Sequence, residues 1–227
     1  MILFVDLEHE RLQQVDPERG VQTYANRLRV KYRLEEITGE PCLVMRYSHV
    51  TPERLRTLGI KALAISGNTT EFDHYSEESL AGLRAVLRAA TYPTIAFCGG
   101  CHLLAETYGA AIGPIGPLPV GVVDPAADNK LAPGMIQERG FMPVQVVAPH
   151  PLFAGLGPTP VFLESHYWEV KALPPDFALY ASTATCPLQM IAHKRLPLIA
   201  VQFHPEYYDD AHPAGRQLLA NFYRLYL

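Results

Sequence analysis

A cysteine between a short apolar run and a glycine-led helical stretch is the first candidate for chemistry. The run at residues 94–97 predicts a buried strand, Cys98 follows it directly, and Gly99 and Gly100 begin the predicted helix. Small residues let the backbone turn sharply there, so that the side chain projects at the top of a sheet. The partial positive charge at a helix N-terminus stabilises a thiolate. The pattern therefore indicates a nucleophilic cysteine.

A histidine and a glutamate about a hundred residues later have the chemistry to assist it. His204 follows the predicted strand at 198–202, which places it on the same rim of the sheet as Cys98. Glu206 lies two residues further on, and such side chains point to the same side of an extended chain. The carboxylate can then fix the imidazole tautomer and support its positive charge. We therefore expect Cys98, His204 and Glu206 to act as nucleophile, base and orienting acid.

The elements that must position these residues alternate in the N-terminal half. Short apolar runs at 2–5, 42–45, 62–65 and 94–97 are separated by helical patterns at 21–37, 52–58 and 76–90. Continuous apolar runs between amphipathic helices are typical of a doubly wound α/β fold, with a mostly parallel sheet and helices on both faces. Ligands in such folds bind beyond the carboxyl ends of the strands. Residues that follow Val5, Ile65 and Phe97 are therefore the first candidates for a site.

The C-terminal half has a different pattern. Residues 113–139 are rich in Gly, Pro and Ala and predict a long loop, either a lid or a partner surface. Extra short strands are predicted at 143–147, 161–163, 168–170, 178–182, 188–191 and 198–202, and a last helix at 213–226. Since no linker of domain size and no repeat interrupts the chain, we expect residues 1–227 to form a single domain.

Composition excludes several classes of protein. Of 227 residues, 48% are hydrophobic and 19% charged, which is ordinary for a globular chain and excludes a disordered one. A net charge of −4 without a basic stripe makes nucleic acid an unexpected partner. No apolar run is long enough to span a membrane, and residues 1–6 do not resemble a signal peptide. Four scattered cysteines are expected to be reduced thiols in the cytoplasm, with no metal.

Three stretches resemble the class I glutamine amidotransferases, which are triad-type glutaminase domains. Residues 96–105, AFCGGCHLLA, resemble that family's G-x-C-x-G-x-Q-L-L-A elbow. Residues 200–206, AVQFHPE, match its G-V-Q-F-H-P-E segment closely, and residues 165–170, SHYWEV, resemble its S-H-x-x-x-V segment. In order and spacing the resemblance spans almost the whole chain. It implies this family's flavodoxin-like fold.

The resemblance also implies an activity, hydrolysis of the γ-amide of glutamine. Cys98 would attack the carboxamide carbon, His204 would give a proton to the departing ammonia, and water would release glutamate from the thioester. The ammonia would pass to a synthetase subunit in trans, because no nucleotide-binding segment is evident in this chain. No cofactor is implied. Around the oxyanion and substrate the resemblance places Gly67, Asn68, Gly99, His102, His166 and Tyr167.

Departures from the family pattern leave alternatives open. His102 stands where the family has a glutamine, and residues 66–71 read SGNTTE in place of an S-G-G-P-G-S-like loop. Another γ-glutamyl compound, either a γ-glutamyl peptide or a γ-glutamyl amine, is therefore an alternative substrate. Cys98 and Cys101 form a C-x-x-C pair, so a redox-switched regulatory protein is a second alternative. A non-catalytic relative that keeps the triad as a relic is a third.

Overall fold

Eight strands form the central sheet of the computed structural model, which describes residues 1–124 and 132–227. Their order across the sheet is β2-β1-β3-β4-β12-β11-β10-β7. The first five pair in parallel, and the pairing beyond β12 is antiparallel. The parallel strands are β1 (Ile2–Asp6), β2 (Cys42–Arg46), β3 (Ala62–Ile65), β4 (Thr94–Phe97) and β12 (Leu198–Val201). The others are β11 (Met190–His193), β10 (Phe177–Ser182) and β7 (Gln145–Val146).

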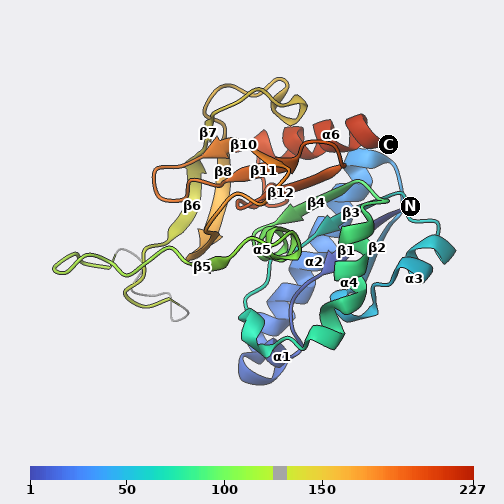
Figure 1. Cartoon of the computed structure of the whole chain (residues 1–227), viewed down its shortest axis with the longest axis horizontal. Coiled ribbons are helices and arrows are strands. Elements are labelled where there is room, and N and C mark those ends of the chain that lie inside the picture. Colours follow the sequence, from blue (N-terminus) through green and yellow to red (C-terminus); the bar gives the residue numbers. More distant parts are fainter. Residues whose placement is uncertain (125–131) are drawn as a thin grey trace.

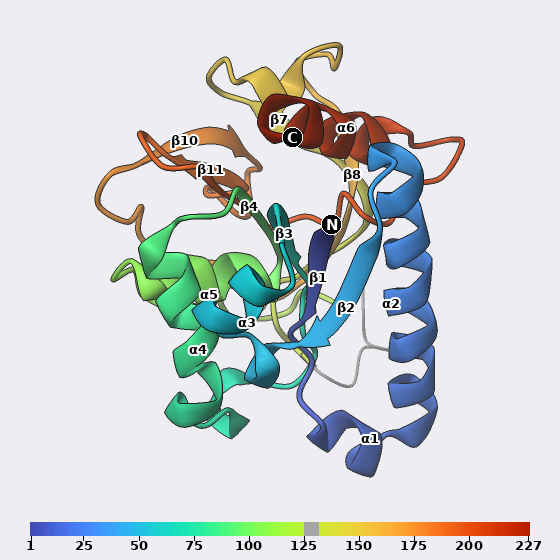
Figure 2. The same cartoon turned by 90° about the vertical axis from the view of Figure 1, so that its right-hand side faces the viewer.

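Helices cover both faces of this sheet, as the sequence predicts (Figures 1 and 2). One face packs against α2 (Pro17–Thr38) and α6 (Ala214–Tyr226), and the other against α3 (Pro52–Thr57), α4 (Glu77–Ala89) and α5 (Gly99–Thr107). Alternate residues of β1 enter the two hydrophobic clusters, Leu3 on one face and Phe4 on the other. Burial on both faces explains why the strands are continuous apolar runs. The doubly wound α/β class is thus confirmed.

Capping residues set the ends of the long helix α2. The Asp16 carboxylate accepts the backbone N–H of Arg19 at 3.1 Å, and Pro17 occupies the first helical position. At the other end Gly39 has a φ of +68°, a left-handed conformation that favours glycine. The helix therefore begins four residues before the predicted start at 21. The short helix α1 (Arg11–Val15) before it was not predicted.

Two small antiparallel sheets complete the C-terminal half. One pairs β5 (Ile112–Pro114) with β9 (Trp168–Val170), and the other pairs β6 (Glu138–Pro143) with β8 (Val161–His166). The prediction of an irregular loop over 113–139 is therefore wrong at both ends, because pairing with distant strands creates β5 and β6. Three short 3₁₀ helices occur elsewhere, at Tyr47–His49, Phe72–His74 and Pro151–Phe153.

The predicted strand at 143–147 is two strands in the structure. β6 ends at Pro143, which has no N–H to continue a ladder, and β7 begins at Gln145 in a different sheet. Val144 between them is buried and donates its N–H to the Pro160 carbonyl at 2.9 Å. The change of sheet lies at the residue where the proline removes a donor.

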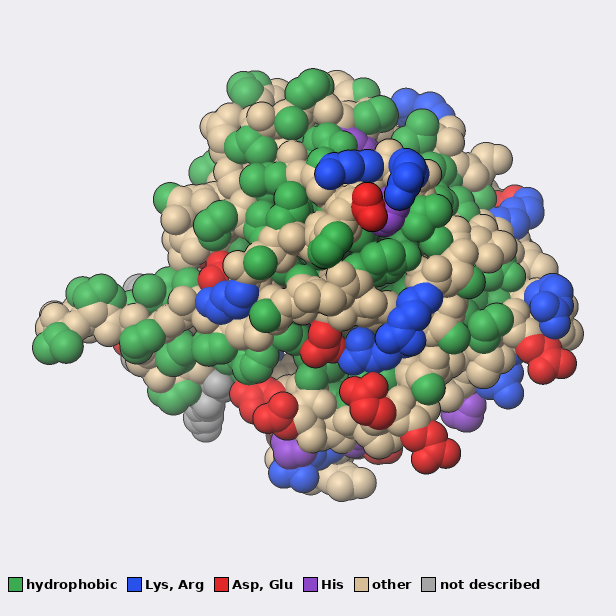
Figure 3. Space-filling model, viewed as in Figure 1, with side chains coloured by type: hydrophobic (Ala, Val, Ile, Leu, Met, Phe, Trp, Pro, Cys, Tyr) green, Lys and Arg blue, Asp and Glu red, His purple; other side chains and the backbone are tan. Residues whose placement is uncertain are grey.

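An arm formed by residues 115–124 projects from the body beyond β5 (Figure 1). Hydrophobic side chains lie along it (Figure 3), and Val120, Val122 and Val123 are exposed. The remaining part of the predicted loop, residues 125–131, lies outside the described residues. Within 1–124 and 132–227, no helix has both the length and the apolar character needed to cross a membrane.

Candidate active site

Cys98 occupies a sharp elbow between β4 and α5. Its backbone has φ +47° and ψ −108°, an unusual conformation for a residue other than glycine, and its N–H donates to Val201 O of the neighbouring strand at 2.8 Å. A Cβ added to Gly100 would lie 2.8 Å from Ile65 O, so only glycine fits that closely against β3. The elbow predicted from the sequence is therefore present and is fixed by both neighbouring strands.

His204 follows β12 and is oriented by two contacts. Its backbone N–H donates to Leu163 O at 2.8 Å, and its ring Nδ1 lies 2.8 Å from Glu206 Oε1. The Glu206 side chain is buried. Burial opposes charging of the imidazole, but the charges of Glu206 and Cys98 outweigh it and raise the pKa of His204 well above its ordinary value. Because Nδ1 faces Glu206, Nε2 remains available for proton transfer.

Gly67 brings the loop after β3 against these residues. A Cβ added to Gly67 would lie 3.0 Å from His204 Cε1 and 3.7 Å from Cys98 Sγ. A Cβ added to Gly99 would lie 3.0 Å from Asn68 N and far too close to Asn68 Oδ1. The Asn68 and Gly99 N–H groups therefore lie close together beside the nucleophile. Neither donates to an acceptor among the described residues. Two such donors could bind an oxyanion formed at Cys98.

His102 lines the cavity, but its ring is already engaged. It is buried, and its Nε2 lies 2.8 Å from Gln202 Oε1. Burial lowers the pKa of His102 to about 4, so the ring is neutral at pH 7. It offers the substrate less freedom of hydrogen bonding than the glutamine that the family pattern has there.

His166 is held inside a buried polar cluster. Its Nε2 lies 2.9 Å from Glu138 Oε2 and 3.2 Å from Glu164 Oε2, and its Nδ1 lies 2.9 Å from Trp168 O. Burial disfavours the charge, but hydrogen bonds to both carboxylates outweigh it and raise the pKa of His166 to about 10. Both ring N–H groups therefore donate within the cluster at pH 7, and only the backbone of His166 remains for a substrate.

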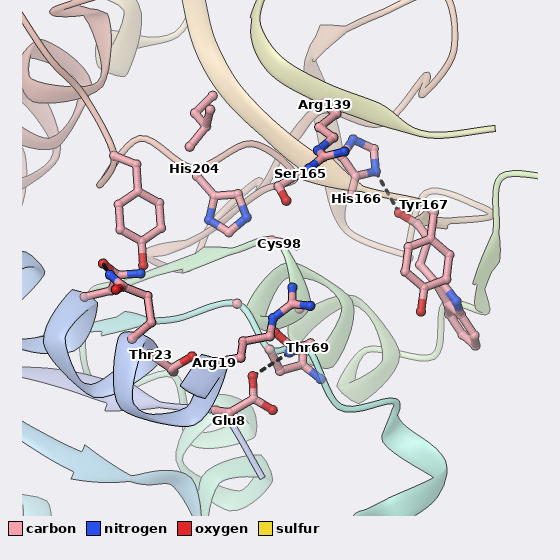
Figure 4. A pocket seen from close by; sticks show the side chains of 18 of the residues that line it. Glu8, Arg19, Thr23, Thr69, Cys98, Arg139, Ser165, His166, Tyr167 and His204 are labelled. Atoms are coloured by element: carbon pink, nitrogen blue, oxygen red, sulfur yellow. Dashed lines mark hydrogen bonds between the residues drawn. The ribbon is translucent and has the colours of Figure 1, made fainter. Parts of the chain in front are cut away.

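Tyr167 is on the cavity wall, and its hydroxyl donates to Glu71 Oε1 at 3.2 Å. The cavity measures about 920 Å³, within the range of small-molecule pockets. Figure 4 shows Cys98 and His204 on one side of it, with Arg139, Ser165 and Tyr167 along the strand opposite. All the site residues predicted from the sequence line this cavity, apart from the buried Glu206 behind His204.

Three buried side chains could in principle hold a metal. Glu138, His166 and Cys186 each offer one ligand atom, and these atoms lie within 4.8 Å of one another. The Glu138 carboxylate, however, already accepts from the Thr183 hydroxyl and from Gln189 Nε2, in addition to the His166 ring. These contacts describe a hydrogen-bonded network in which the carboxylate has its partners, and we assign no ion to it.

Cys101 is an unpromising partner for a redox switch. Its side chain is completely buried on α5, and burial raises the pKa of its thiol. Reactive cysteines are usually accessible and have a low thiol pKa. Both Cys98 and Cys101 are free thiols in the structure.

Several residues around the site were not found in the sequence. Glu8 and Arg27 contact the loop that carries Gly67 and Asn68, and Arg33 donates to Glu206 O at 2.7 Å. The only signal for them was the position of acidic residues directly after the first strand. The arginines come from α2, where nothing in the helical pattern separates them from solvent-facing ones.

The chain resembles known glutamine amidotransferases in sequence and in structure. Residues 29–225 match the family described as "Glutamine amidotransferase class-I". One of the separate subunits of the glutamine-hydrolyzing GMP synthase of Pyrococcus furiosus is 30% identical over 182 residues, which cover 79% of this chain and 93% of that protein. The protein of the same name from Thermococcus kodakarensis is 31% identical with the same coverage.

Solved structures show the same fold. A candidate GMP synthase subunit from Thermoplasma acidophilum has a TM-score of 0.70 at 23% identity, covering 99% of this chain and 94% of that one. A glutamine amidotransferase from Methylobacillus flagellatus has a TM-score of 0.62 at 16% identity, covering 91% and 70%.

Proposed function

The chain belongs to the class I glutamine amidotransferases, and we propose that it is the glutaminase subunit that supplies ammonia to a separate GMP-forming synthetase. The relatives from Pyrococcus furiosus and Thermococcus kodakarensis are named as subunits, and the aligned region covers 93% of each of them. This coverage supports a stand-alone glutaminase. We propose in addition that residues 1–227 act as one domain, with glutamine as the substrate.

In this proposal Cys98 Sγ attacks the γ-carboxamide carbon of glutamine. The negative charge that develops on the carboxamide oxygen is stabilised by the Asn68 and Gly99 N–H groups. The C–N bond then breaks, and the His204 imidazolium gives its proton to the departing nitrogen, which leaves as ammonia. Water, deprotonated by His204, attacks the thioester, and glutamate leaves as the thiolate re-forms. Glu206 holds the imidazole in the orientation required for both transfers.

The observation that carries this proposal is the arrangement of Cys98, His204 and Glu206 around one cavity. A strained elbow supplies the nucleophile, and a buried carboxylate 2.8 Å from His204 Nδ1 leaves the other ring nitrogen for proton transfer. The same constellation of nucleophile, base and orienting acid recurs in acyl-transfer enzymes on unrelated folds.

Two measurements test the proposal. The purified protein is treated with a glutamine-shaped γ-electrophile, and peptide mapping should find one adduct on Cys98 that excess glutamine prevents. A GMP-forming synthetase with its nucleotide substrates is then mixed with the protein. GMP should form from glutamine with the wild type but not with Cys98→Ala, whereas ammonium salts should support both mixtures. Glutamine-dependent ammonia release without GMP formation would refute the proposed partner but not the glutaminase.

One observation favours a second candidate, a γ-glutamyl peptide or γ-glutamyl amine hydrolase. The His102 ring is occupied by Gln202, so this position does not present a free amide to the substrate. The cavity of about 920 Å³ also has room for a group attached to the γ-nitrogen. Comparing kcat/KM for glutamine with kcat/KM for γ-glutamyl amines decides between the two, since the second candidate requires a clear preference for the amines.

A further inference from the structure

Two buried carboxylates after β1 take no part in the triad. Asp6 and Glu8 are only 5% and 4% exposed, and both face the loop that follows β3. Together with Arg27 they precede residue 29, where the match to the family begins. Burial of charged groups is unfavourable unless they are paired and hydrogen-bonded. Their partners therefore indicate what they hold in place.

Glu8 binds the backbone of the loop directly. Its Oε2 accepts the Thr69 N–H at 2.6 Å, and its Oε1 accepts the Thr70 N–H at 3.0 Å and the Thr70 hydroxyl at 2.7 Å. In the view of Figure 4, Thr69 lies between Glu8 and Cys98. One carboxylate thus fixes the two residues that follow Asn68.

Arg27 fixes the residue on the other side. Its Nε donates to Asp6 Oδ1 at 2.8 Å, and its Nη2 donates to Gly67 O at 2.9 Å. The Ser66 hydroxyl donates to the same carbonyl at 2.8 Å. A guanidinium can reach a carboxylate and a carbonyl at once because its donors form a rigid fork.

The fixed carbonyl determines where the next N–H points. Gly67 O and Asn68 N–H belong to one planar peptide group, in which a trans bond directs them to opposite sides. Because the carbonyl faces Arg27, the Asn68 N–H faces away from Arg27. On that side lies Gly99, whose added Cβ would be 3.0 Å from Asn68 N. The hydrogen bonds that Arg27 donates and Glu8 accepts thus orient one particular peptide group.

We propose that Arg27, paired with Asp6, and Glu8 are positioning residues that hold the Gly67–Asn68 peptide with its N–H aimed at the oxyanion formed on Cys98. This inference rests on the proposed function, in which Asn68 and Gly99 N–H groups stabilise that oxyanion. The loop at 66–71 has one glycine, and the two charged braces fix the backbone of this loop in place.

The test compares reactions that do and do not create an oxyanion. Hydrolysis of glutamine creates one, and so does acylation of Cys98 by 4-nitrophenyl acetate, in which the acetyl group moves to Sγ and 4-nitrophenolate leaves. Alkylation of Cys98 by iodoacetamide displaces iodide from a saturated carbon and creates none. The variants are Glu8→Gln and Arg27→Lys, which keep the size of the side chain or its charge. Thr70→Val removes a single hydroxyl contact.

We expect Glu8→Gln and Arg27→Lys to lower kcat for glutamine and the ester acylation rate by about tenfold to a hundredfold, because loss of one oxyanion donor costs about 10²–10³. The KM for glutamine should change less than about threefold and the alkylation rate less than about twofold, since binding and the thiolate are intact. Thr70→Val should show the same pattern at smaller size. Glu10→Gln and Arg88→Lys, at exposed positions, should behave as wild type.

The proposal is overturned if folded Glu8→Gln and Thr70→Val keep glutamine and ester rates within about twofold of wild type, or if all three rates fall together. Should Arg27→Lys fail to fold, these two variants still decide. A wild type that is acylated by the ester but does not hydrolyse glutamine refutes the proposed function alone. The effect of Glu8→Gln on the ester then still tests the positioning role.

Discussion

Two buried histidines in this protein are paired with glutamates, and their environments differ in one respect. His204 uses Nδ1 for Glu206 and keeps Nε2 toward Cys98, whereas both nitrogens of His166 are held, by Glu138 and Glu164 on one side and by Trp168 O on the other. The pKa is raised in both because carboxylates stabilise the buried charge. A His–Glu pair is therefore suited to proton transfer only where one nitrogen faces the reacting atoms. The other pair supports structure.

Removing His204 should give the largest effect. We expect His204→Ala to lower kcat for glutamine by about a thousandfold or more, since both proton transfers lose their carrier. Ammonia release measures this, with Cys98→Ala as the reference for background. The midpoint of thermal unfolding should change little in comparison. Activity within tenfold of wild type would show that His204 is not the base.

Breaking the other pair should chiefly affect stability. Glu138→Gln leaves the His166 charge without its main partner, and breaking a buried ion pair costs about 3 kcal/mol of unfolding free energy. Urea unfolding measures the loss, and kcat per folded molecule should remain within about tenfold. Thr183→Val is a milder control, because it removes one donor to Glu138 and no charge. Loss of catalysis without loss of stability would remove the contrast between the two histidines.

The pH dependence of stability should also separate them from ordinary histidines. The pKa of His166 rises from 6.5 in the unfolded chain to about 10 in the folded protein, so its contribution is complete below the lower value and is lost as the pH rises toward the higher one. Between about pH 7 and 9 this group alone lowers the unfolding free energy by at most about 1.4 kcal/mol per pH unit. Urea unfolding should show a shallower decline in His166→Gln. Equal slopes would mean that His166 is neutral in the native state.

His102 should give the smallest effect. We expect His102→Gln, which introduces the residue type of the family elbow, to lower the KM for glutamine by about two- to fivefold, because a free amide adds about one neutral hydrogen bond. The pKa of His102 is about 4, so wild-type activity should show no titration of this ring above pH 5. Steady-state kinetics with glutamine and a γ-glutamyl amine measure the change. A higher KM for both substrates would assign His102 a direct binding role.

The sequence allowed the parallel half of the fold and the positions of Cys98, His204 and Glu206 to be predicted because both depend on local patterns. Buried strands such as β1 are apolar runs, and each reactive residue directly follows one. The strand β6 could not be predicted, since it exists through pairing with β8 some twenty residues later. The same holds for Glu8 and Arg27, whose partners in the loop lie 40 or more positions away.

The backbone at Cys98 has a consequence for how the protein can change over generations. A non-glycine residue at φ +47° and ψ −108° carries strain of about 1–3 kcal/mol, which the packing of β4 and α5 must offset. Glycine would relieve that strain, so mutation toward greater thermodynamic stability at this position leads away from the nucleophile. Selection for stability and selection for chemistry thus oppose each other at one residue. A lineage released from the need for ammonia would be expected to lose this cysteine early.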